Sequence, residues 1–270
     1  MKQARTLYYQ ITGLEAHTIV PIHGGLNSVN YLINGEFVLR CKNPTVDTRY
    51  DPQNEYLAER LVAPTGLVPK LLHFDQDSGD KLTAFMPKTA FLSRPPTIDE
   101  VKLVAAALRT LHGLKPDGLS PFDPLARYEI YKAASQIETP SHNEKKIVEY
   151  VVERLGHDPL VFAHNDLVRG NILFKDDRVF IIDFEYAGIN HPLFDLASFI
   201  TENNIDDPTL IKVFLTAYYQ EKNIPWRDFE VFCRFLDYLW YYWAQGMFVT
   251  TGQSIFKTIA RLKWSRIKKY

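Results

Sequence analysis

The sequence is poor in cysteine. Of its 270 residues only Cys41 and Cys233 are cysteines, they lie far apart, and no cluster of cysteine and histidine has the spacing of a zinc site. Neither a disulfide framework nor a structural metal is therefore implied, and a reducing cytoplasm fits this composition.

An excess of charge of one sign is also missing. The chain has 31 Lys and Arg against 32 Asp and Glu, which gives a formal net charge of -1. A balanced chain of this kind creates no global field that would attract nucleic acid or an anionic membrane. We therefore expect a small-molecule substrate and no nucleic-acid partner.

Long apolar runs, internal repeats and low-complexity linkers are absent too. The longest apolar stretch, around Tyr238 to Val249, contains Gln245 and is too short to span a bilayer. The first residues, Met1 to Arg5, are not followed by an apolar signal core. We expect a soluble, cytoplasmic protein without membrane insertion, and the sequence is silent on its oligomeric state.

The most informative stretch runs from Phe162 to Asp195. Two apolar runs, 171–174 and 179–183, flank a polar turn, and this pattern predicts a β-hairpin. The segment His164-Asn165-Asp166 precedes the first run. Each run therefore delivers polar side chains to one edge of a rigid hairpin.

Three residues of this stretch, Asp166, Asn171 and Asp183, have the side chains that phosphoryl transfer needs. An acidic residue orients the attacking hydroxyl, and oxygen ligands hold Mg²⁺ against the triphosphate of ATP. The spacing Asp-x4-Asn, followed by an apolar run that ends in Asp-Phe, is typical of kinase catalytic loops. We predict that Asp166 is the acid-base group and that Asn171 and Asp183 are catalytic magnesium ligands.

On these residues the chain resembles the choline/ethanolamine kinases within the aminoglycoside-phosphotransferase and protein-kinase-like group. The matching segments are His164-Asn165-Asp166 with Asn171, Ile182 to Tyr186, Phe194 to Ala197, Gly24-Gly25-Leu26, and Trp240 to Trp243. The resemblance implies an α+β, two-lobed kinase-like fold with ATP and Mg²⁺ in the cleft between the lobes. Residues 1–86 would form a small N-lobe with a five-stranded antiparallel sheet plus a helix, and residues 87–270 a larger, mainly helical C-lobe.

The N-lobe sheet can be traced in the pattern of apolar and turn residues. Strands are expected at 18–20, 29–33, 36–40, 71–75 and 81–85. Asn34-Gly35 is a tight-turn signal of the type I′ kind. Helices are expected from the Thr97 cap to Leu111 and at 124–136, 143–155, 192–201, 208–220 and 225–249.

A small loop in this lobe is expected to approach the phosphates of ATP. It contains Gly24, Gly25, Asn27 and Ser28, which can bring backbone N–H groups close to an anion. An ordinary glycine turn between two strands has the same composition. Phe85 and Met86 lie in the crossover between lobes, which in this fold binds adenine through its backbone.

Arg40 stands where kinases place a cation that contacts the phosphates. Its planar fork gives bidentate contact with phosphate oxygens, and Lys42 on the same face is the rival candidate. The resemblance assigns Glu55, in a helix capped by Asp51, the task of orienting this cation. Glu59, one turn further on, is expected to be solvated.

Three other features receive a structural interpretation. His164 is expected to bond the backbone of the catalytic loop, and Asp195 is expected to support the shape of that loop. The basic segment 257–269 is interpreted as a solvated helix face around its apolar residues.

The acceptor site is expected on the long helix that follows Pro225. Its apolar stripe faces inward, and Trp240 and Trp243, three residues apart, lie on one face. Choline kinases have a similar Trp-x-x-Trp in the box that holds the trimethylammonium, which aromatic faces bind well. The resemblance adds Glu185 and Tyr186, just after Asp183, and Asp166 to the substrate-binding residues.

We interpret the chain as an ATP- and Mg²⁺-dependent kinase that phosphorylates the hydroxyl of choline to phosphocholine. Ethanolamine, thiamine, an aminoglycoside or a sugar are the alternative acceptors. A non-catalytic, pseudokinase-like nucleotide-binding module is the alternative of a different class, and the intact Asp166, Asn171 and Asp183 argue against it.

Overall fold

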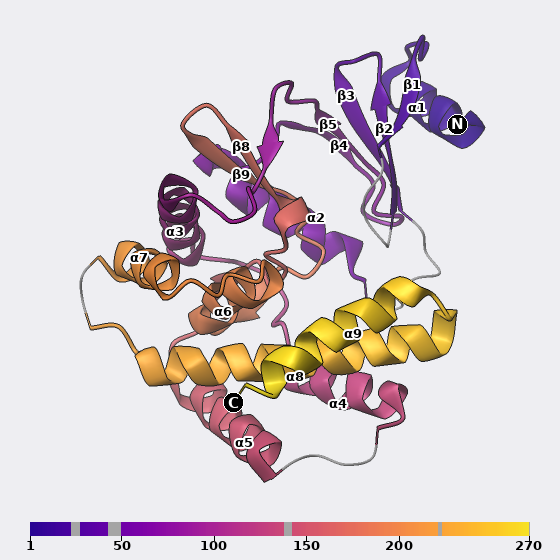
Figure 1. The fold of residues 1–270 in the computed structure, drawn as a ribbon. Helices are drawn as coiled ribbons and strands as arrows, with labels where there is room; N and C mark the ends of the chain where they lie inside the picture. Colours follow the sequence, from indigo (N-terminus) through magenta and orange to yellow (C-terminus); the bar gives the residue numbers. More distant parts are fainter. Residues whose placement is uncertain (23–27, 43–49, 138–141, 221–222, 270) are drawn as a thin grey trace.

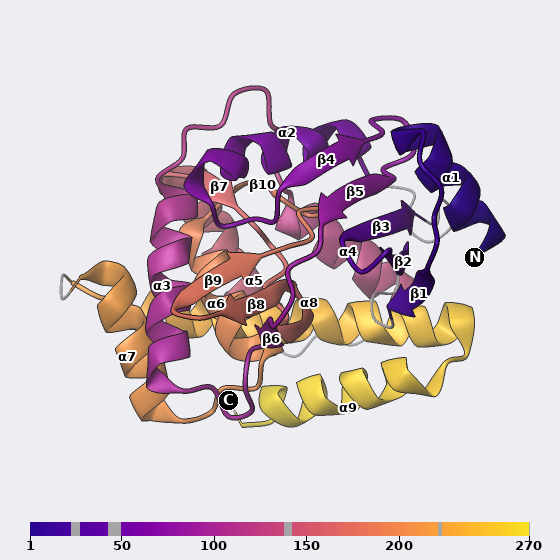
Figure 2. The same ribbon diagram turned by 90° about the horizontal axis from the view of Figure 1, so that it is seen from above.

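The computed structural model describes residues 1–22, 28–42, 50–137, 142–220 and 223–269. Gly24, Gly25 and Asn27, expected in the phosphate loop, lie outside the described residues. Figures 1 and 2 show a small sheet and a larger, mostly helical part.

The small part is built on a five-stranded antiparallel sheet with the order β1-β2-β3-β5-β4, which confirms the prediction. Its strands are β1 (Ile19–Ile22), β2 (Ser28–Ile33), β3 (Phe37–Lys42), β4 (Leu71–Phe74) and β5 (Lys81–Ala84). Asn34 and Gly35 have φ angles of 55° and 71°, as a type I′ turn requires. This turn sets the register in which β2 pairs with β3.

Helix α1 (Lys2–Thr12), which the sequence pattern did not predict, covers one face of this sheet (Figure 1). It buries Ala4 and Tyr8 against Ile33, Leu39 and Leu82 in a small hydrophobic core. The sheet therefore has a core of its own.

Helix α2 (Pro52–Val62) joins the sheet to the rest of the molecule. Asp51 caps it by accepting hydrogen bonds from two backbone N–H groups, as expected, and the 3₁₀ turn Ala63–Thr65 follows. Ala58 and Val62 belong to the large core of the helical part. The sheet and the helical part are thus packed on a shared helix.

The chain then pairs with the predicted hairpin. Strand β6 (Ala90–Phe91) lies beside β8 (Ile172–Lys175), which pairs with β9 (Arg178–Ile181). Strands β7 (Val161–Ala163) and β10 (Gly188–Asn190) form a second small sheet at the base of the catalytic loop. A lobe boundary between residues 86 and 87 stays a prediction.

Seven helices are described after this crossover: α3 (Ile98–His112), α4 (Pro124–Ser135), α5 (His142–His157), α6 (Pro192–Glu202), α7 (Pro208–Tyr219), α8 (Trp226–Thr251) and α9 (Ser254–Ile267). The first six confirm the predicted helices to within a few residues. Thr97 and Glu100 form the capping box at the start of α3. Figures 1 and 2 both show α8 and α9 lying side by side.

The stripe on α8 faces the large core, as predicted, with Phe232, Phe235 and Leu236 fully buried. Within the described residues, none of the helices combines the length and apolar character needed to cross a membrane.

The prediction that the cations of the last helix, α9, are solvated is wrong for two of them. Lys263 is 4% exposed and Arg266 is half-buried, and both form ion pairs with Asp237 on α8. Spacing along α9 could not reveal this, because the paired carboxylate lies on another helix.

Candidate active site

The catalytic loop starts where β7 ends, and a buried carboxylate shapes it. Asp195, on α6, accepts hydrogen bonds from the backbone N–H groups of His164 and Asn165 at 2.8 and 2.7 Å. Its other partner is His112 Nε2 at 3.1 Å. Burial alone would raise the pKa of Asp195, but these hydrogen bonds and the charge of His112 keep it below its usual range. The supporting geometry expected for Asp195 is thus present.

His164 lies fully buried behind the loop. Its Nδ1 accepts the N–H of Asp166 at 3.2 Å, so the ring proton is on Nε2, which donates to the carbonyl of Ile182 at 3.1 Å. Burial lowers the pKa of His164, which favours this neutral form. The ring therefore ties the loop to the end of β9, in keeping with the expected structural role.

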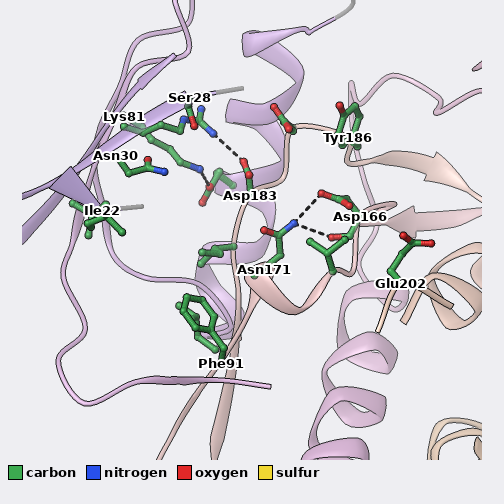
Figure 3. A pocket seen from close by; sticks show the side chains of 18 of the residues that line it. Ile22, Ser28, Asn30, Lys81, Phe91, Asp166, Asn171, Asp183, Tyr186 and Glu202 are labelled. Atoms are coloured by element: carbon green, nitrogen blue, oxygen red, sulfur yellow. Dashed lines mark hydrogen bonds and ion pairs between the residues drawn. The ribbon is translucent and has the colours of Figure 1, made fainter. Parts of the chain in front are cut away.

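Asp166 and Asn171 contact each other directly (Figure 3). The Asn171 amide donates to the Asp166 carboxylate at 2.9 Å and to its carbonyl at 3.0 Å. Burial, with the charges of Asp183, Glu185 and Glu202, raises the pKa of Asp166 well above its usual range. Asn171 thus uses its nitrogen to hold Asp166 and keeps its side-chain oxygen for another partner.

Asp183 follows β9 in a strained backbone conformation, with φ at 70°. A non-glycine residue in the left-handed region is uncommon, and such strain is concentrated at functional sites. Its carboxylate lines the same cavity as Asp166 and Asn171 and lies 3.2 Å from Arg40. The structure therefore brings the three predicted catalytic residues together.

Arg40 reaches this point from β3 and is held on several sides. It forms a bidentate ion pair with Glu55 at 2.7 and 2.8 Å and donates to the carbonyl of Gly79 at 2.7 Å. At Gly79, φ is 79° and a Cβ would lie 2.2 Å from the Tyr50 hydroxyl, so only glycine fits. Burial alone would raise the pKa of Glu55, but the charges of Lys81 and Arg40 outweigh this effect, so the pKa of Glu55 lies below its usual range. Glu55 thus contacts both terminal nitrogens of the Arg40 guanidinium.

Glu59, expected to be solvated, is instead 4% exposed. It accepts from Lys81 at 2.6 Å, and Lys81 also pairs with Glu55 at 2.9 Å. Lys81 lines the cavity and was missed, although it lies opposite Arg40 in the register of β3 and β5. The sequence pattern does not reveal this register. Because the register places Lys81 next to α2, Glu59 is buried in an ion pair instead of being solvated.

Lys42, the rival to Arg40, pairs with Glu185 instead. Its ammonium lies 3.9 Å from the centroid of the Tyr50 ring. Glu185, assigned to the acceptor, therefore also links β3 to the segment after β9.

Carboxylates outnumber cations in this cluster of described residues. Arg40, Lys42 and Lys81 face five acids, which are Glu55, Glu59, Asp166, Asp183 and Glu185. A formal excess of negative charge repels the triphosphate of a nucleotide unless a cation accompanies it. The electrostatics therefore favour nucleotide binding together with a metal ion.

The donor atoms fit Mg²⁺. Asn171 and Asp183 both line the cavity and offer hard oxygen atoms. Among the described residues no group of three or more His, Cys, Asp and Glu side chains is arranged to hold a metal alone. Mg²⁺ does not require one, because it keeps several waters and takes phosphate oxygens from its nucleotide.

The cavity has a volume of about 710 Å³ and extends between the sheet and the helices. Ser28, Phe85 and Met86, which the sequence analysis assigned to the nucleotide, line it. The apolar side chains of Val38, Leu173 and Ile182 line it too. Phe85 already donates its backbone N–H to the carbonyl of Glu36 at 2.7 Å. This N–H is therefore not available to an adenine ring.

The other end of the cavity is aromatic. Trp240 and Trp243 line it from α8 and lie edge to face, with 5.8 Å between ring centroids, and Tyr131 on α4 is 6.3 Å from Trp240. Gly246 allows the two helices to approach closely, because a Cβ there would lie 3.1 Å from Ala134. The structure thus places the predicted tryptophans on one cavity with Asp166.

Tyr186 also lines the cavity, but its ring has a cation nearby. The guanidinium of Arg127 lies 4.9 Å from the centroid of the Tyr186 ring. This arginine, on α4, was not predicted, and it occupies one approach to the ring.

Glu202 is a cavity residue that the sequence analysis missed. Its side chain is 13% exposed, and in the view of Figure 3 Asp166 lies between Glu202 and Asn171. The signal was present, because positions 195 and 202 are seven apart and share one face of a helix. Asp195 was recognised on this face and Glu202 was not.

The fold and this cavity define a kinase-like phosphotransferase. A model described as "phosphotransferase enzyme family" matches residues 18–229, and the chain belongs to this family. It is 28% identical to the protein LicA of Haemophilus influenzae over 253 residues, which cover 82% of this chain and 71% of that protein.

Solved structures share the fold, among them the following two. A choline/ethanolamine kinase family protein from Mesorhizobium loti has a TM-score of 0.83 and 24% identity, covering 99% of this chain and 93% of that one. Choline kinase LicA from Streptococcus pneumoniae has a TM-score of 0.80 and 18% identity, covering 100% of both chains. The similarity to choline/ethanolamine kinases within the family is thus confirmed, and the chain is a small-molecule kinase that phosphorylates an alcohol.

Proposed function

We propose that this kinase uses ATP and Mg²⁺ to phosphorylate choline to phosphocholine. The observation that carries the proposal is the single cavity lined both by Asp166, Asn171 and Asp183 and by Trp240 and Trp243. A phosphate donor and a cationic alcohol bound at its two ends would meet at Asp166.

The acceptor end suits a cation. Aromatic faces attract a desolvated ammonium by about 0.5 to 2 kcal/mol per contact. The largely buried carboxylate of Glu202 adds a negative charge on the same cavity. The relatives that are named choline kinases support the same acceptor class.

The chemistry of the reacting atoms follows from Asp166. Its carboxylate accepts a hydrogen bond from the acceptor hydroxyl and orients that oxygen toward the γ-phosphorus. The new O–P bond forms as the bond to the β,γ-bridging oxygen breaks, ADP leaves, and the hydroxyl proton passes to Asp166 and then to solvent. A magnesium ion held by Asn171 and Asp183 would neutralise charge on the phosphates.

Ethanolamine is the second candidate, because of Glu202. A primary ammonium needs hydrogen-bond acceptors when it leaves water, and a carboxylate beside an aromatic wall supplies them. Choline, which has no N–H donor, gains from the aromatic faces and from the charge of Glu202 alone.

A panel of acceptors tests the proposal. ADP release is coupled to a detectable reaction with choline, ethanolamine, thiamine, an aminoglycoside and the neutral isostere 3,3-dimethylbutanol, and the product is identified by phosphorus NMR. Choline should give the highest kcat/KM, and activity should vanish without Mg²⁺. Equal use of 3,3-dimethylbutanol and choline, or a higher kcat/KM for thiamine, would rule choline out.

A further inference from the structure

The C-terminal helix α9 reaches the acceptor end of the cavity through one side chain. The Lys263 ammonium lies 2.6 Å from Glu202 Oε1, and both side chains are almost entirely buried. It also lies 3.3 Å from the carbonyl of Thr201 and 3.3 Å from Asp237 Oδ1. Lys263 is therefore fixed by three oxygen atoms.

The two oxygens of Glu202 have different surroundings. Oε1 accepts from Lys263 and from the Thr201 hydroxyl, at 2.6 and 3.2 Å. Within the described part of the chain, Oε2 accepts no hydrogen bond, and Glu202 lines the cavity. Oε2 is thus the oxygen left for a ligand.

Glu202 depends on Lys263 for charge compensation more than the neighbouring Asp237 does. Asp237 has a second cation, because Arg266 Nε lies 3.1 and 3.0 Å from its two oxygens. The charges near Glu202 are Lys263 from α9, Asp237 from α8 and Asp166 from the catalytic loop. Burial raises the pKa of Glu202, and Lys263 is the cation that opposes this rise.

We propose that Lys263 is a positioning residue for the acceptor: it holds Glu202 as an oriented carboxylate whose free oxygen binds the cationic group of the alcohol. The inference rests on the proposed function in that it takes the acceptor to be a cation. A C-terminal helix that contributes no reacting group thereby sets acceptor affinity.

Removing the Lys263 ammonium tests the proposal, because it should change how the KM for choline depends on pH. In wild type and Lys263→Met, the KM for choline is measured between about pH 5 and pH 9, together with the KM for neutral 3,3-dimethylbutanol. Without Lys263, Glu202 should take up a proton at higher pH. The pH at which the KM for choline rises on acidification should move up by at least about one unit, since an adjacent opposite charge shifts a carboxyl by about that much.

The shift should be specific to the cationic acceptor. The KM for 3,3-dimethylbutanol and the KM for ATP should keep their wild-type pH profiles, because neither ligand needs the Glu202 charge. At saturating choline, kcat should stay within about threefold of wild type, since Lys263 contacts no reacting atom.

Matched variants separate this role from plain stability. Lys263→Arg keeps the charge and should restore the wild-type profile. Arg261→Met removes a cation from an exposed position two residues earlier on α9 and should change nothing. In a Glu202→Gln background the pH step should be absent, and adding Lys263→Met should produce no further shift.

An unchanged profile in Lys263→Met, or the same shift in Arg261→Met, would overturn the proposal. If Lys263→Met does not fold, Lys263→Gln takes its place. A wild-type enzyme that phosphorylates no cationic alcohol would sink the proposed function instead. A carbon-13 NMR titration of the Glu202 carboxyl still tests the pair in that case: an upward shift without Lys263 supports it, and no shift refutes it.

Discussion

The two ends of the cavity are built in different ways. At the phosphate end, side chains from β3, β5, α2 and the segment after β9 hold one another through buried ion pairs, with Arg40 and Glu55 at the centre. At the acceptor end, one face of α8 presents Trp240 and Trp243, and Glu202, which is paired with Lys263, lines the same cavity. Charge organises the first end, and apolar shape organises the second.

The difference has an energetic consequence. Removing one partner from a buried ion pair leaves an uncompensated charge and costs about 3 to 5 kcal/mol. Removing one aromatic face from a cation site costs about 0.5 to 2 kcal/mol. Breaking an ion pair at the phosphate end should therefore have a larger effect than removing one aromatic face at the acceptor end.

The largest effect is expected where the two ends meet, at Asp166. Asp166→Ala should lower kcat by about 10²- to 10⁴-fold, the usual range for a positioned acid-base group. Binding of both substrates should survive, as measured by calorimetry beside steady-state kinetics. Asp177→Ala, at an exposed position in the turn of the same hairpin, is the control and should behave as wild type. If Asp166→Ala turned over within about threefold of wild type, Asp166 would be excluded as the base.

Glu55→Gln breaks the phosphate end at its centre. Arg40 and Lys81 would lose the carboxylate that both contact, so the free energy of unfolding should fall by about 3 to 5 kcal/mol in urea denaturation. The KM for ATP should rise, and the KM for the acceptor should change little. Glu36→Gln removes an exposed glutamate from the turn between β2 and β3 and should leave stability unchanged. A loss equal to that of the control would show that the ion pairs do not hold this end together.

Asp183→Asn weakens the phosphate end without removing a side chain. The lost ligand charge should raise the Mg²⁺ concentration needed for half-maximal activity by about 10- to 100-fold, and added Mg²⁺ should restore part of the rate. Titrating Mg²⁺ at fixed ATP measures the shift. An unchanged Mg²⁺ requirement would remove Asp183 from the metal site.

The sequence could predict those features whose residues lie close together in the chain. Asp166, Asn171 and Asp183 lie at the two ends of one hairpin, so their spacing along the chain already indicates that they are close in space. The caps at Asp51 and Thr97 were equally readable, because a cap is fixed by residues within one turn. Local patterns therefore predicted the sheet, the helices from α2 to α8 and the position of the three central residues.

Pairings between distant elements could not be predicted. Glu59 was expected in solvent because nothing near it in the chain shows that β5 places Lys81 against it. Lys263 was expected on a solvated face for the same reason, since Glu202 lies on α6. A buried ion pair requires a partner that only the folded register supplies, and the hydrophobic pattern of one helix contains no information about it.

The smallest effect is expected at the acceptor end, from Trp243→Ala. Loss of one aromatic face should raise the KM for choline by about 2- to 30-fold, which corresponds to about 0.5 to 2 kcal/mol, and leave the KM for ATP unchanged. Trp264→Ala is the matched control, because Trp264 is 41% exposed and stacks on Tyr241 rather than lining the cavity. The neutral 3,3-dimethylbutanol separates charge from shape: its KM should rise less than that of choline, since it loses apolar contact but no attraction of a cation to the ring. An equal rise for both alcohols would mean that the tryptophans supply only a shaped apolar wall, and the preference for a cation would then fall to Glu202 alone.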